Sequence, residues 1–406
     1  MEQIKKLLVS IRLANEEVSL GELVSESKGI YFKYFPSFIE RGIQISPFKL
    51  KLGAEIRQAD ALPFDGLFGV FADSMPDGWG RLLLDRALAE KGIRNANLSL
   101  LNRLAFVGSK GMGALTYRPE MEIEHLLRFE FELDAIASSS KQVLEGLESK
   151  VIDKLFALGG SSGGARPKIL VAFNNITKEI IGSDQILPIG FEHWLIKFPS
   201  SNDSIDIANI EFSYYKMALD AGIEMSECRL FTGESNKQYF GTKRFDRVGK
   251  SCIHMHSAAG IMHDNFRQSN LDYGNLMDCA FKLENDVIAY EKILRLAAFN
   301  VFAHNRDDHS KNFSFLMNSD GIWRAAPAYD LTFSSSSHGM HSTMIAGESA
   351  NPTKKNLIDL GRYFKVNNSK KIIDQVYNVV QNWRFYAEKS GVGKQSIKRI
   401  ESVIVK

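Results

Sequence analysis

The sequence predicts an α+β fold with two lobes, preceded by a smaller α+β subdomain. Three observations lead to this class. Apolar and polar residues alternate with the period of a strand in many segments of the first 250 residues. From residue 273 onward, apolar residues recur with helical spacing, which predicts a mostly helical second lobe. Glycine-rich and polar loops interrupt both patterns. We expect the subdomain at 1–118, the small lobe at 119–246 and the helical lobe at 247–406.

Length and composition exclude several classes of protein. A chain of 406 residues is too long for one core, and 44% hydrophobic with 24% charged residues is typical of a globular protein in water. Fifty basic and 48 acidic residues leave a net charge of +2, so DNA contact is expected to be indirect, through a partner. The sequence has no apolar run of membrane length, and its alternating start leads us to expect no signal peptide. Three cysteines without a CxxC pair favour the cytoplasm.

The first 118 residues are expected to combine strands with one clear helix. Trp79 and the leucines that follow it form an apolar stripe, and core packing is the favoured interpretation of that stripe. A glycine turn in Ser109–Pro119 leads into a further strand. The expected strands are Leu7–Leu13, Gly29–Phe35 and Ile43–Lys51, and the expected helix is Arg81–Glu90.

A glycine- and serine-rich loop opens the small lobe and runs directly into an expected strand, Lys168–Phe173. Glycine permits unusual backbone dihedrals and leaves no side chain in the way, so such a loop can bring several N–H groups to phosphate oxygens. It is not a Walker loop, because no G-K-[ST] follows and a strand comes next. A flexible hairpin tip is the alternative. The candidate cofactor-binding residues here are Ser161, Ser162, Gly163 and Gly164.

A lysine on the next expected strand, His193–Ser200, supports the phosphate interpretation. Lys197 lies between Ile196 and Phe198, and a half-buried ammonium needs an anionic partner. ATP phosphates and a glutamate on the following helix, Glu211, would supply the charge. The alternative is an edge-strand lysine that reaches solvent. The helix is expected at Ala208–Ala221, with Asp206 as its cap.

The chain is expected to cross between the lobes after a strand at Tyr239–Phe245. The backbone of Lys243, Arg244 and Phe245 would then meet the adenine edge of the nucleotide. His254 and His256 are two residues apart without a third zinc-type ligand, so we interpret them as an alternating strand. The helices expected beyond this point are Tyr273–Phe281, Asp286–Ala303, Asn356–Phe364, Ser369–Ala387 and Lys394–Val403.

The most informative stretch runs from Ala298 to Phe333. Asp307 and Asn312 stand five residues apart in a polar loop behind an apolar helix, and Asp330 follows a short strand and a turn. This layout indicates phosphoryl transfer: one carboxylate receives the proton of an attacking hydroxyl, and an amide and a second carboxylate hold Mg²⁺ against the phosphates of ATP. The spacing fits the kinase pattern H-R-D-x-x-x-x-N, with His304 one position early. A solvated helix terminus is the alternative.

Together, the ordered segments GGSSGGARPK, HWLIKFP, KRFDR, NRDDHSKN and APAYDL resemble the HipA family of bacterial serine/threonine kinases, the toxins of type II toxin-antitoxin pairs. The resemblance implies that Asp307 is the catalytic base, Asn312 and Asp330 bind Mg²⁺, and His309 and Lys311 help to place the phosphates. It also implies autophosphorylation of the glycine-rich loop at Ser161, with Ser162 as a neighbouring candidate. The chain departs from the family's Gln-Glu-Lys loop ending and has Lys243 where a glutamate is found.

The resemblance also implies partners. The expected protein substrate is an aminoacyl-tRNA synthetase, and the expected inhibitor is an antitoxin with a helix-turn-helix domain, through which DNA is contacted only indirectly. Two alternatives stay open: a catalytically silent kinase-like binding or corepressor protein, and a kinase of small molecules. Retention of Lys197, Asp307, Asn312 and Asp330 weighs against the silent protein.

Overall fold

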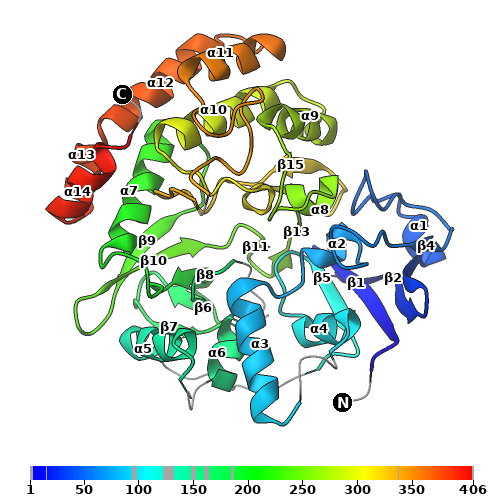
Figure 1. Ribbon diagram of the computed structural model, residues 1–406. Helices are drawn as coiled ribbons and strands as arrows, with labels where there is room; N and C mark the ends of the chain where they lie inside the picture. Colours follow the sequence, from blue (N-terminus) through cyan, green and yellow to red (C-terminus); the bar gives the residue numbers. More distant parts are fainter. Residues whose placement is uncertain are drawn as a thin grey trace. The chain divides into compact units, whose positions relative to one another are not determined.

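The structure is a computed structural model that describes residues 3–14, 16–93, 98–121, 132–147, 152–159, 164–183, 187–336 and 338–404. The chain divides into two units, and Figure 1 labels their helices and strands. Unit 1 comprises Met1–Asp203, Phe231–His256 and Met317–Gly321. Unit 2 comprises Ser204–Leu230, Ser257–Leu316 and Ile322–Lys406. Strands and helices occur in both, as the predicted α+β class requires.

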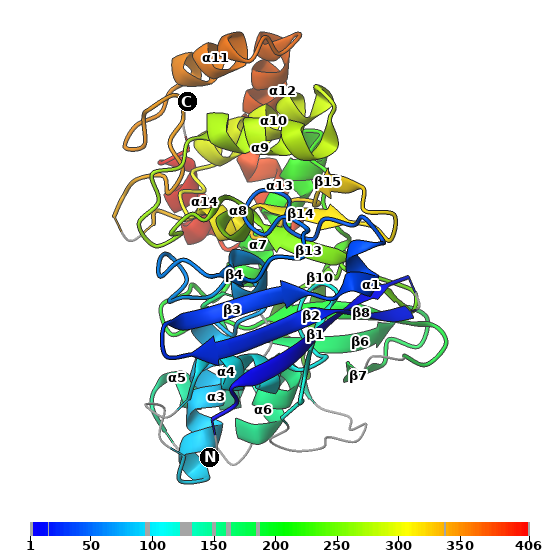
Figure 2. The same cartoon turned by 90° about the vertical axis from the view of Figure 1, so that its right-hand side faces the viewer.

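The N-terminal sheet of unit 1 has the strand order β4-β3-β2-β1-β5, with neighbouring strands antiparallel. Figure 2 shows β1, β2 and β3 side by side. The alternating residues Leu7, Val9, Ile11 and Leu13 are buried, which confirms the expected first strand. The strands are β1 (Lys6–Leu13), β2 (Glu16–Glu26), β3 (Gly29–Tyr34), β4 (Arg57–Gln58) and β5 (Leu115–Arg118).

Strand β2 lies outside the segments in which alternation predicted a strand. Its centre contains Gly21, and a Cβ there would collide with the Lys33 carbonyl and the Phe32 ring on β3. The glycine needed for this close approach, together with glutamates near both ends of the strand, hides the period-two pattern.

The expected strand at Ile43–Lys51 is wrong, because that segment forms turns and irregular structure. Its backbone is held by side chains instead of a neighbouring strand. The Leu50 carbonyl accepts from the Tyr34 hydroxyl at 2.8 Å, and the Ile45 carbonyl lies 2.9 Å from His254 Nε2. Side-chain partners therefore replace the ladder that a strand would need.

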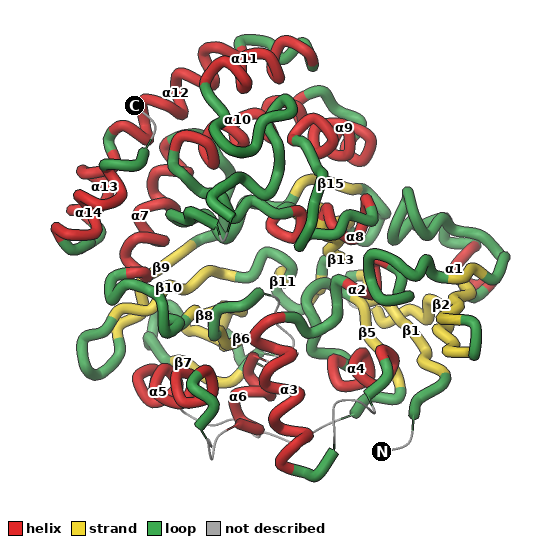
Figure 3. Tube along the Cα trace, viewed as in Figure 1, coloured by secondary structure: helices red, strands yellow, loops and turns green. Residues whose placement is uncertain are grey.

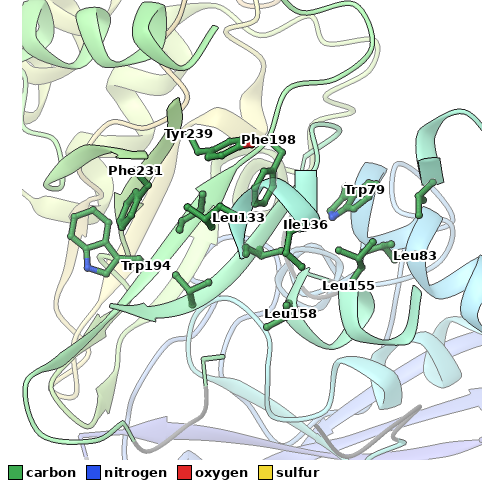
Figure 4. Close-up of a cluster of buried hydrophobic side chains, with 14 of the residues drawn as sticks. Trp79, Leu83, Leu133, Ile136, Leu155, Leu158, Trp194, Phe198, Phe231 and Tyr239 are labelled. Atoms are coloured by element: carbon green, nitrogen blue, oxygen red, sulfur yellow. The ribbon is translucent and has the colours of Figure 1, made fainter. Parts of the chain in front are cut away.

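The second sheet of unit 1 has the order β7-β6-β8-β10-β9. One hydrophobic core joins its inner face to three helices, α3, α5 and α6, and Figure 4 shows Trp79, Leu155 and Trp194 among its members. The sheet strands are β6 (Lys168–Asn174), β7 (Ile180–Gly182), β8 (Phe191–Lys197), β9 (Cys228–Thr232) and β10 (Gln238–Lys243), and the helices are α3 (Gly78–Glu90), α5 (Leu133–Leu144) and α6 (Ile152–Gly159).

Helix α3 is apolar on two sides. Leu83 and Ala87 belong to the core of the second sheet, whereas Leu84 and Leu88 pack with Phe106 in a separate cluster. This confirms core packing of the Trp79 and leucine stripe. The remaining short elements of the first 256 residues are α1 (Pro36–Ile39), α2 (Gly69–Ala72), α4 (Leu100–Val107), β11 (Arg247–Val248) and β12 (Ser251–Cys252), followed by β13 (His254–Ser257), which crosses from unit 1 into unit 2.

Unit 2 is mostly helical, and the last turns of α10 bury apolar side chains: Ala297, Ala298, Val301 and Phe302. Figure 3 shows the helices as red tubes and the connection from β15 to α11 as a long loop, in which the described residues form no helix or strand. The elements are α7 (Ile207–Asp220), α8 (Ala258–Met262), α9 (Tyr273–Glu284), α10 (Ile288–Phe302), η2 (Ser310–Asn312), β14 (Ser314–Met317), β15 (Trp323–Ala325), α11 (Lys354–Tyr363), α12 (Ser369–Gln381), α13 (Trp383–Lys389) and α14 (Lys394–Glu401).

One expectation about these helices is wrong. The helix expected at Ser369–Ala387 breaks at Asn382, which ends α12 and begins α13, so that Trp383 can pack on Tyr214 of α7. Asp206 is the N-cap residue of α7, as expected, but its side chain makes no capping hydrogen bond. Its carboxylate accepts instead from Gly393 N and Ser396 Oγ, both at 2.9 Å, at the start of α14. No described helix is both long and apolar enough to cross a membrane.

Candidate active site

The catalytic segment predicted from the sequence follows α10 in unit 2 and carries Asp307, His309, Lys311 and Asn312. The Asp307 side chain is 57% exposed, so a substrate hydroxyl can reach it. His309 Nε2 lies 3.8 Å from Asp307 Oδ1. An exposed carboxylate beside an imidazole is suited to accept a proton and to hold it close to a second polar group.

Asn312 closes this segment on itself. Its side-chain Nδ2 donates to the Asp307 backbone carbonyl at 2.7 Å. The bond explains the five-residue spacing, since the intervening residues form a single tight turn ending in η2. With the NH₂ end directed to the backbone, the amide oxygen is the end of Asn312 that can bind a cation.

Asp308, which the sequence analysis did not single out, anchors the segment from inside. It is 1% exposed. Its carboxylate accepts from the Tyr273 hydroxyl at 2.9 Å and the Ser342 N–H at 2.8 Å, and Oδ2 lies 2.9 Å from His341 Nδ1. Burial first, and then the negative charge of Asp308, raise the pKa of Tyr273 well above its usual value. The available signal was the pair Asp307-Asp308, since two adjacent side chains in an extended loop point in opposite directions.

The anchor extends into α9 and α10. Asn300 Nδ2 donates to the Tyr273 hydroxyl at 2.8 Å, and Asn305 Nδ2 donates to Asn300 Oδ1 at 3.0 Å. All these groups are buried. A connected buried network of this kind restricts the loop to one conformation, because each group has specific partners and loses them if the loop moves.

The segment that contains Asp330 is bonded to the catalytic segment at both ends. At one end the Arg306 N–H donates to the Ser334 carbonyl and the Ser334 N–H donates to the His304 carbonyl, each at 3.0 Å. At the other end the Tyr329 hydroxyl donates to the Lys311 carbonyl at 2.6 Å. In unit 2, three of the predicted site residues therefore lie on two segments that hydrogen bonds join: Asp307, Asn312 and Asp330.

Asp330 has a φ of +54°, in the left-handed region that non-glycine residues seldom adopt. Such strain persists only where the surroundings impose it, and it is concentrated at functional sites. The carboxylate of Asp330 and the amide oxygen of Asn312 are the hard oxygen ligands that Mg²⁺ prefers, with water and phosphate oxygens completing the shell. No group of three or more His, Cys, Asp or Glu in the described part of the chain is arranged to hold a metal ion.

Phe266 lies against the Lys311 and His309 side chains of this segment, and the sequence patterns did not point to it. Lys311 Nζ is 4.7 Å from the centre of its ring, and the His309 ring centre is 5.6 Å away. Ser310 Oγ donates to Asp264, which fastens the Phe266 loop to the catalytic segment. A cation–π contact restricts the lysine side chain while leaving its ammonium group able to bind phosphate.

Unit 1 carries the predicted phosphate-binding lysine and a second lysine opposite it. Lys197, at the end of β8, pairs across the ladder with Lys168 at the start of β6. Both side chains are buried, and Lys197 Nζ lies 5.4 Å from the centre of the Phe240 ring. Like charges directly opposite each other destabilise a sheet, so a polyanion that binds both would be stabilising. Lys168 was treated in the sequence only as the first residue of a strand.

The glycine-rich loop is described from Gly164 onward. Ser161, Ser162 and Gly163 lie outside the described residues, so their roles stay predictions. Gly164 has a φ of +89°, and a Cβ at this position would collide with Lys168 Nζ. The Lys168 ammonium therefore lies directly beside the described end of the loop.

The predicted adenine-contacting segment is held by side chains. Lys243 forms an ion pair with Glu192 on β8. The Arg244 guanidinium is buried and donates to both carboxylate oxygens of Asp246, at 2.9 and 2.7 Å, and its backbone N–H donates to the His193 carbonyl at 2.9 Å. Although burial raises the pKa of Asp246, its arginine neighbours hold that pKa well below the usual range. The Arg244 N–H is thus already used, and adenine contacts are expected from other backbone groups of the segment.

Glu211 is 3% exposed on α7 and belongs to unit 2, whereas Lys197 belongs to unit 1. Burial of Glu211 is consistent with a charge that is compensated within the fold. The pair itself stays a prediction.

Another set of side chains in unit 1 has the distances of a catalytic triad. His256 Nε2 lies 3.0 Å from Ser46 Oγ, and His256 Nδ1 lies 2.6 Å from Asp73 Oδ2. Ser46 is only 1% exposed, so no substrate can reach its hydroxyl. We therefore assign these three residues a structural role, fastening the irregular segment that contains Ser46.

Comparisons with known proteins agree over most of the chain. Residues 11–118 match the family model described as HipA N-terminal domain, and residues 160–383 match the model described as HipA-like C-terminal domain. A search of curated proteins gave no match.

Among solved structures, the chain is similar to HipA of Shewanella oneidensis MR-1, solved in complex with HipB and its operator DNA. The TM-score is 0.67 and the identity 16%, covering 98% of this chain and 95% of that one. A second match is CtkA, a proinflammatory kinase of Helicobacter pylori, with a TM-score of 0.31 and 13% identity over 53% of this chain and 92% of that one. Since the model of the HipA-like C-terminal domain alone covers more than half of the chain, the chain belongs to the HipA family.

Proposed function

We propose that this chain is an ATP- and magnesium-dependent serine/threonine protein kinase. The proposal rests on two hydrogen-bonded segments in unit 2. One carries the exposed carboxylate of Asp307 and the amide of Asn312, and the other carries Asp330, whose backbone φ is strained. The paired buried lysines of unit 1 add positive charge suited to phosphates. Neither feature is required for a scaffold that only binds another protein.

In this proposal Asp307 accepts the proton of a serine or threonine hydroxyl. The hydroxyl oxygen then forms a bond to the γ-phosphorus of ATP as the bond from that phosphorus to the bridging oxygen of ADP breaks. Asn312 and Asp330 hold Mg²⁺, which when bound neutralises the developing phosphate charge. Lys197 and Lys168 bind phosphate oxygens, and His309 and Lys311 orient the transferred group.

The same proposal includes regulation and partners. We propose autophosphorylation in the glycine-rich loop at Ser161 or Ser162, an aminoacyl-tRNA synthetase as substrate, and neutralisation by a helix-turn-helix antitoxin that brings the chain to DNA. The similarity to a HipA that was solved with HipB and operator DNA supports the antitoxin partner. The near-neutral charge of this chain supports DNA contact through that partner.

The test begins with a thermal shift on adding ATP with and without Mg²⁺, followed by transfer of radiolabelled γ-phosphate. We expect a magnesium-dependent shift and label on protein, with label lost in Asp307→Ala. Asp278→Ala, an exposed aspartate on α9, is the matched control and should behave as the parent. A shift without transfer would favour a silent binding protein, and label on a metabolite would favour a small-molecule kinase. If the chain neither binds ATP nor transfers its phosphate, the kinase proposal is refuted.

A further inference from the structure

The start of helix α3, its N-cap Asp77 with Gly78 and Trp79 (the Asp77–Trp79 turn), is hydrogen-bonded to both backbone groups of one residue of the glycine-rich loop. The Gly164 N–H donates to Asp77 Oδ1 at 2.5 Å. The Trp79 N–H donates to the Gly164 carbonyl at 3.0 Å. Both backbone groups of Gly164 are therefore bonded to a segment that lies 87 residues earlier in the chain.

The Trp79 side chain extends this connection to the ends of the elements that flank the loop. Its Nε1 donates to the Lys168 carbonyl at 3.1 Å, at the first residue of β6. Gly159, the last residue of α6, lies so close that a Cβ there would be 3.2 Å from Trp79 Nε1 and would collide with the Lys168 carbonyl. Since Trp79 is 1% exposed within the main core of unit 1, the turn is held by a rigid support.

Gly78, in the middle of the turn, is required by contact between two backbones. It has a φ of +39°, and a Cβ at this position would lie 2.5 Å from the Gly164 carbonyl oxygen and 2.7 Å from Ala165 Cα. Both are main-chain atoms, which cannot rotate away as the end of a side chain can. Any larger residue must therefore push the glycine-rich loop and the turn apart.

We propose that the Asp77–Trp79 turn is a positioning element for nucleotide binding in unit 1, an inference that rests on the kinase function proposed above. By holding Gly164, it keeps the end of the glycine-rich loop, with the Lys168 ammonium beside it, in the geometry that receives phosphate oxygens. A glycine-rich segment has many conformations of similar energy, so ordering it in advance removes an entropic cost from binding. Asp77 acts through the loop and does not itself contact the nucleotide.

The experiment measures binding of a magnesium complex of a non-hydrolysable ATP analogue to the full chain by calorimetry, together with hydrogen–deuterium exchange of the peptide containing Gly164–Lys168. For Asp77→Ala we expect the dissociation constant to rise by on the order of tenfold, as for loss of one charge-assisted hydrogen bond, and exchange in this peptide to increase. Asp77→Asn keeps an acceptor oxygen for the Gly164 N–H and should restore most of the affinity. Glu55→Ala, an exposed carboxylate in the same region, should bind as the parent.

The outcomes separate this inference from the proposed function. If the parent chain fails to bind the analogue, the proposed function itself is wrong. If the parent binds and Asp77→Ala binds equally well, the inference is overturned, whatever happens to exchange or to the melting temperature. Should Asp77→Ala fail to fold, Gly78→Ala tests the same contact by steric displacement. We expect Gly78→Ala to raise the dissociation constant by at least the tenfold expected for Asp77→Ala. If Gly78→Ala folds and binds the analogue with the parent's affinity, the inference is also overturned.

Discussion

Removal of the carboxylate should have opposite consequences at the two adjacent aspartates of the catalytic segment. The Asp307 side chain is 57% exposed, whereas Asp308 is 1% exposed and its carboxylate accepts several hydrogen bonds. We expect Asp307→Ala to abolish phosphoryl transfer while the fold stays intact. We expect Asp308→Ala to destabilise unit 2, because the groups that donate to its carboxylate would stay buried without an acceptor.

The magnitude for Asp308→Ala follows from its partners. The Tyr273 hydroxyl, the Ser342 N–H and the His341 ring lie within 2.9 Å of the carboxylate, and the Thr343 N–H lies at 3.3 Å. Breaking a buried charged network by deleting one member costs about 3–5 kcal/mol in free energy of unfolding. For a domain of this size, each kcal/mol lowers the melting temperature by roughly 2–4 °C, so we expect a fall on the order of 10 °C. Asp308→Asn keeps one acceptor oxygen, so its melting temperature should lie between those of the parent and Asp308→Ala.

The assay pairs melting curves from circular dichroism with transfer of radiolabelled phosphate by the same preparations. For Asp307→Ala we expect a melting temperature close to the parent's, since exposed substitutions usually change stability by no more than about 0.5 kcal/mol, and a rate about 10²- to 10⁴-fold lower. A melting temperature for Asp308→Ala within about 2 °C of the parent's would show that the buried network does not stabilise unit 2. Equal destabilisation by both variants would contradict the assignment of an exposed catalytic and a buried structural aspartate.

Three further predictions concern other parts of the chain. Lys197→Met should weaken binding of the magnesium–ATP complex about 10- to 100-fold, as measured by calorimetry, with little change in the melting temperature of the free chain. Asp330→Gly should keep or raise stability, because glycine tolerates the φ of +54°, yet lose the magnesium-dependent part of the ATP thermal shift. Burial, and then the neighbouring His256, lower the pKa of His254 to about 4 from an ordinary value of 6.5. The unfolded chain therefore binds more protons between these values, so stability should fall as the pH drops from about 6.5 to 4, and melting curves of His254→Gln should show less of that fall.

Local patterns predicted the elements that position the candidate site. Alternation located β1, β6 and β8, and helical spacing located α7 and α10, because each pattern records which face of an element is buried. The spacing between Asp307 and Asn312 was equally informative, since one hydrogen bond from the Asn312 amide closes that turn. Alternation did not predict β2, because close contact with β3 requires a glycine in the middle of β2, and that glycine interrupts the alternating pattern.

Other features depend on segments that meet only in the folded chain. Neighbouring residues gave no sign that Lys168 lies opposite Lys197, because the register of β6 on β8 sets that pairing. Likewise, Asp308 is structural because Tyr273 and the residues around Ser342 arrive from about 35 residues away on either side.

The sequence alone therefore determined the class of fold, the helices and strands that carry the candidate site, and the residue types suited to phosphoryl transfer. Tertiary structure decided which of two adjacent carboxylates is exposed and which segment holds Gly164. The physical reason is the range over which each property acts. Periodicity and short spacings follow from the geometry of one continuous segment, whereas burial and hydrogen-bond partners depend on where distant segments return.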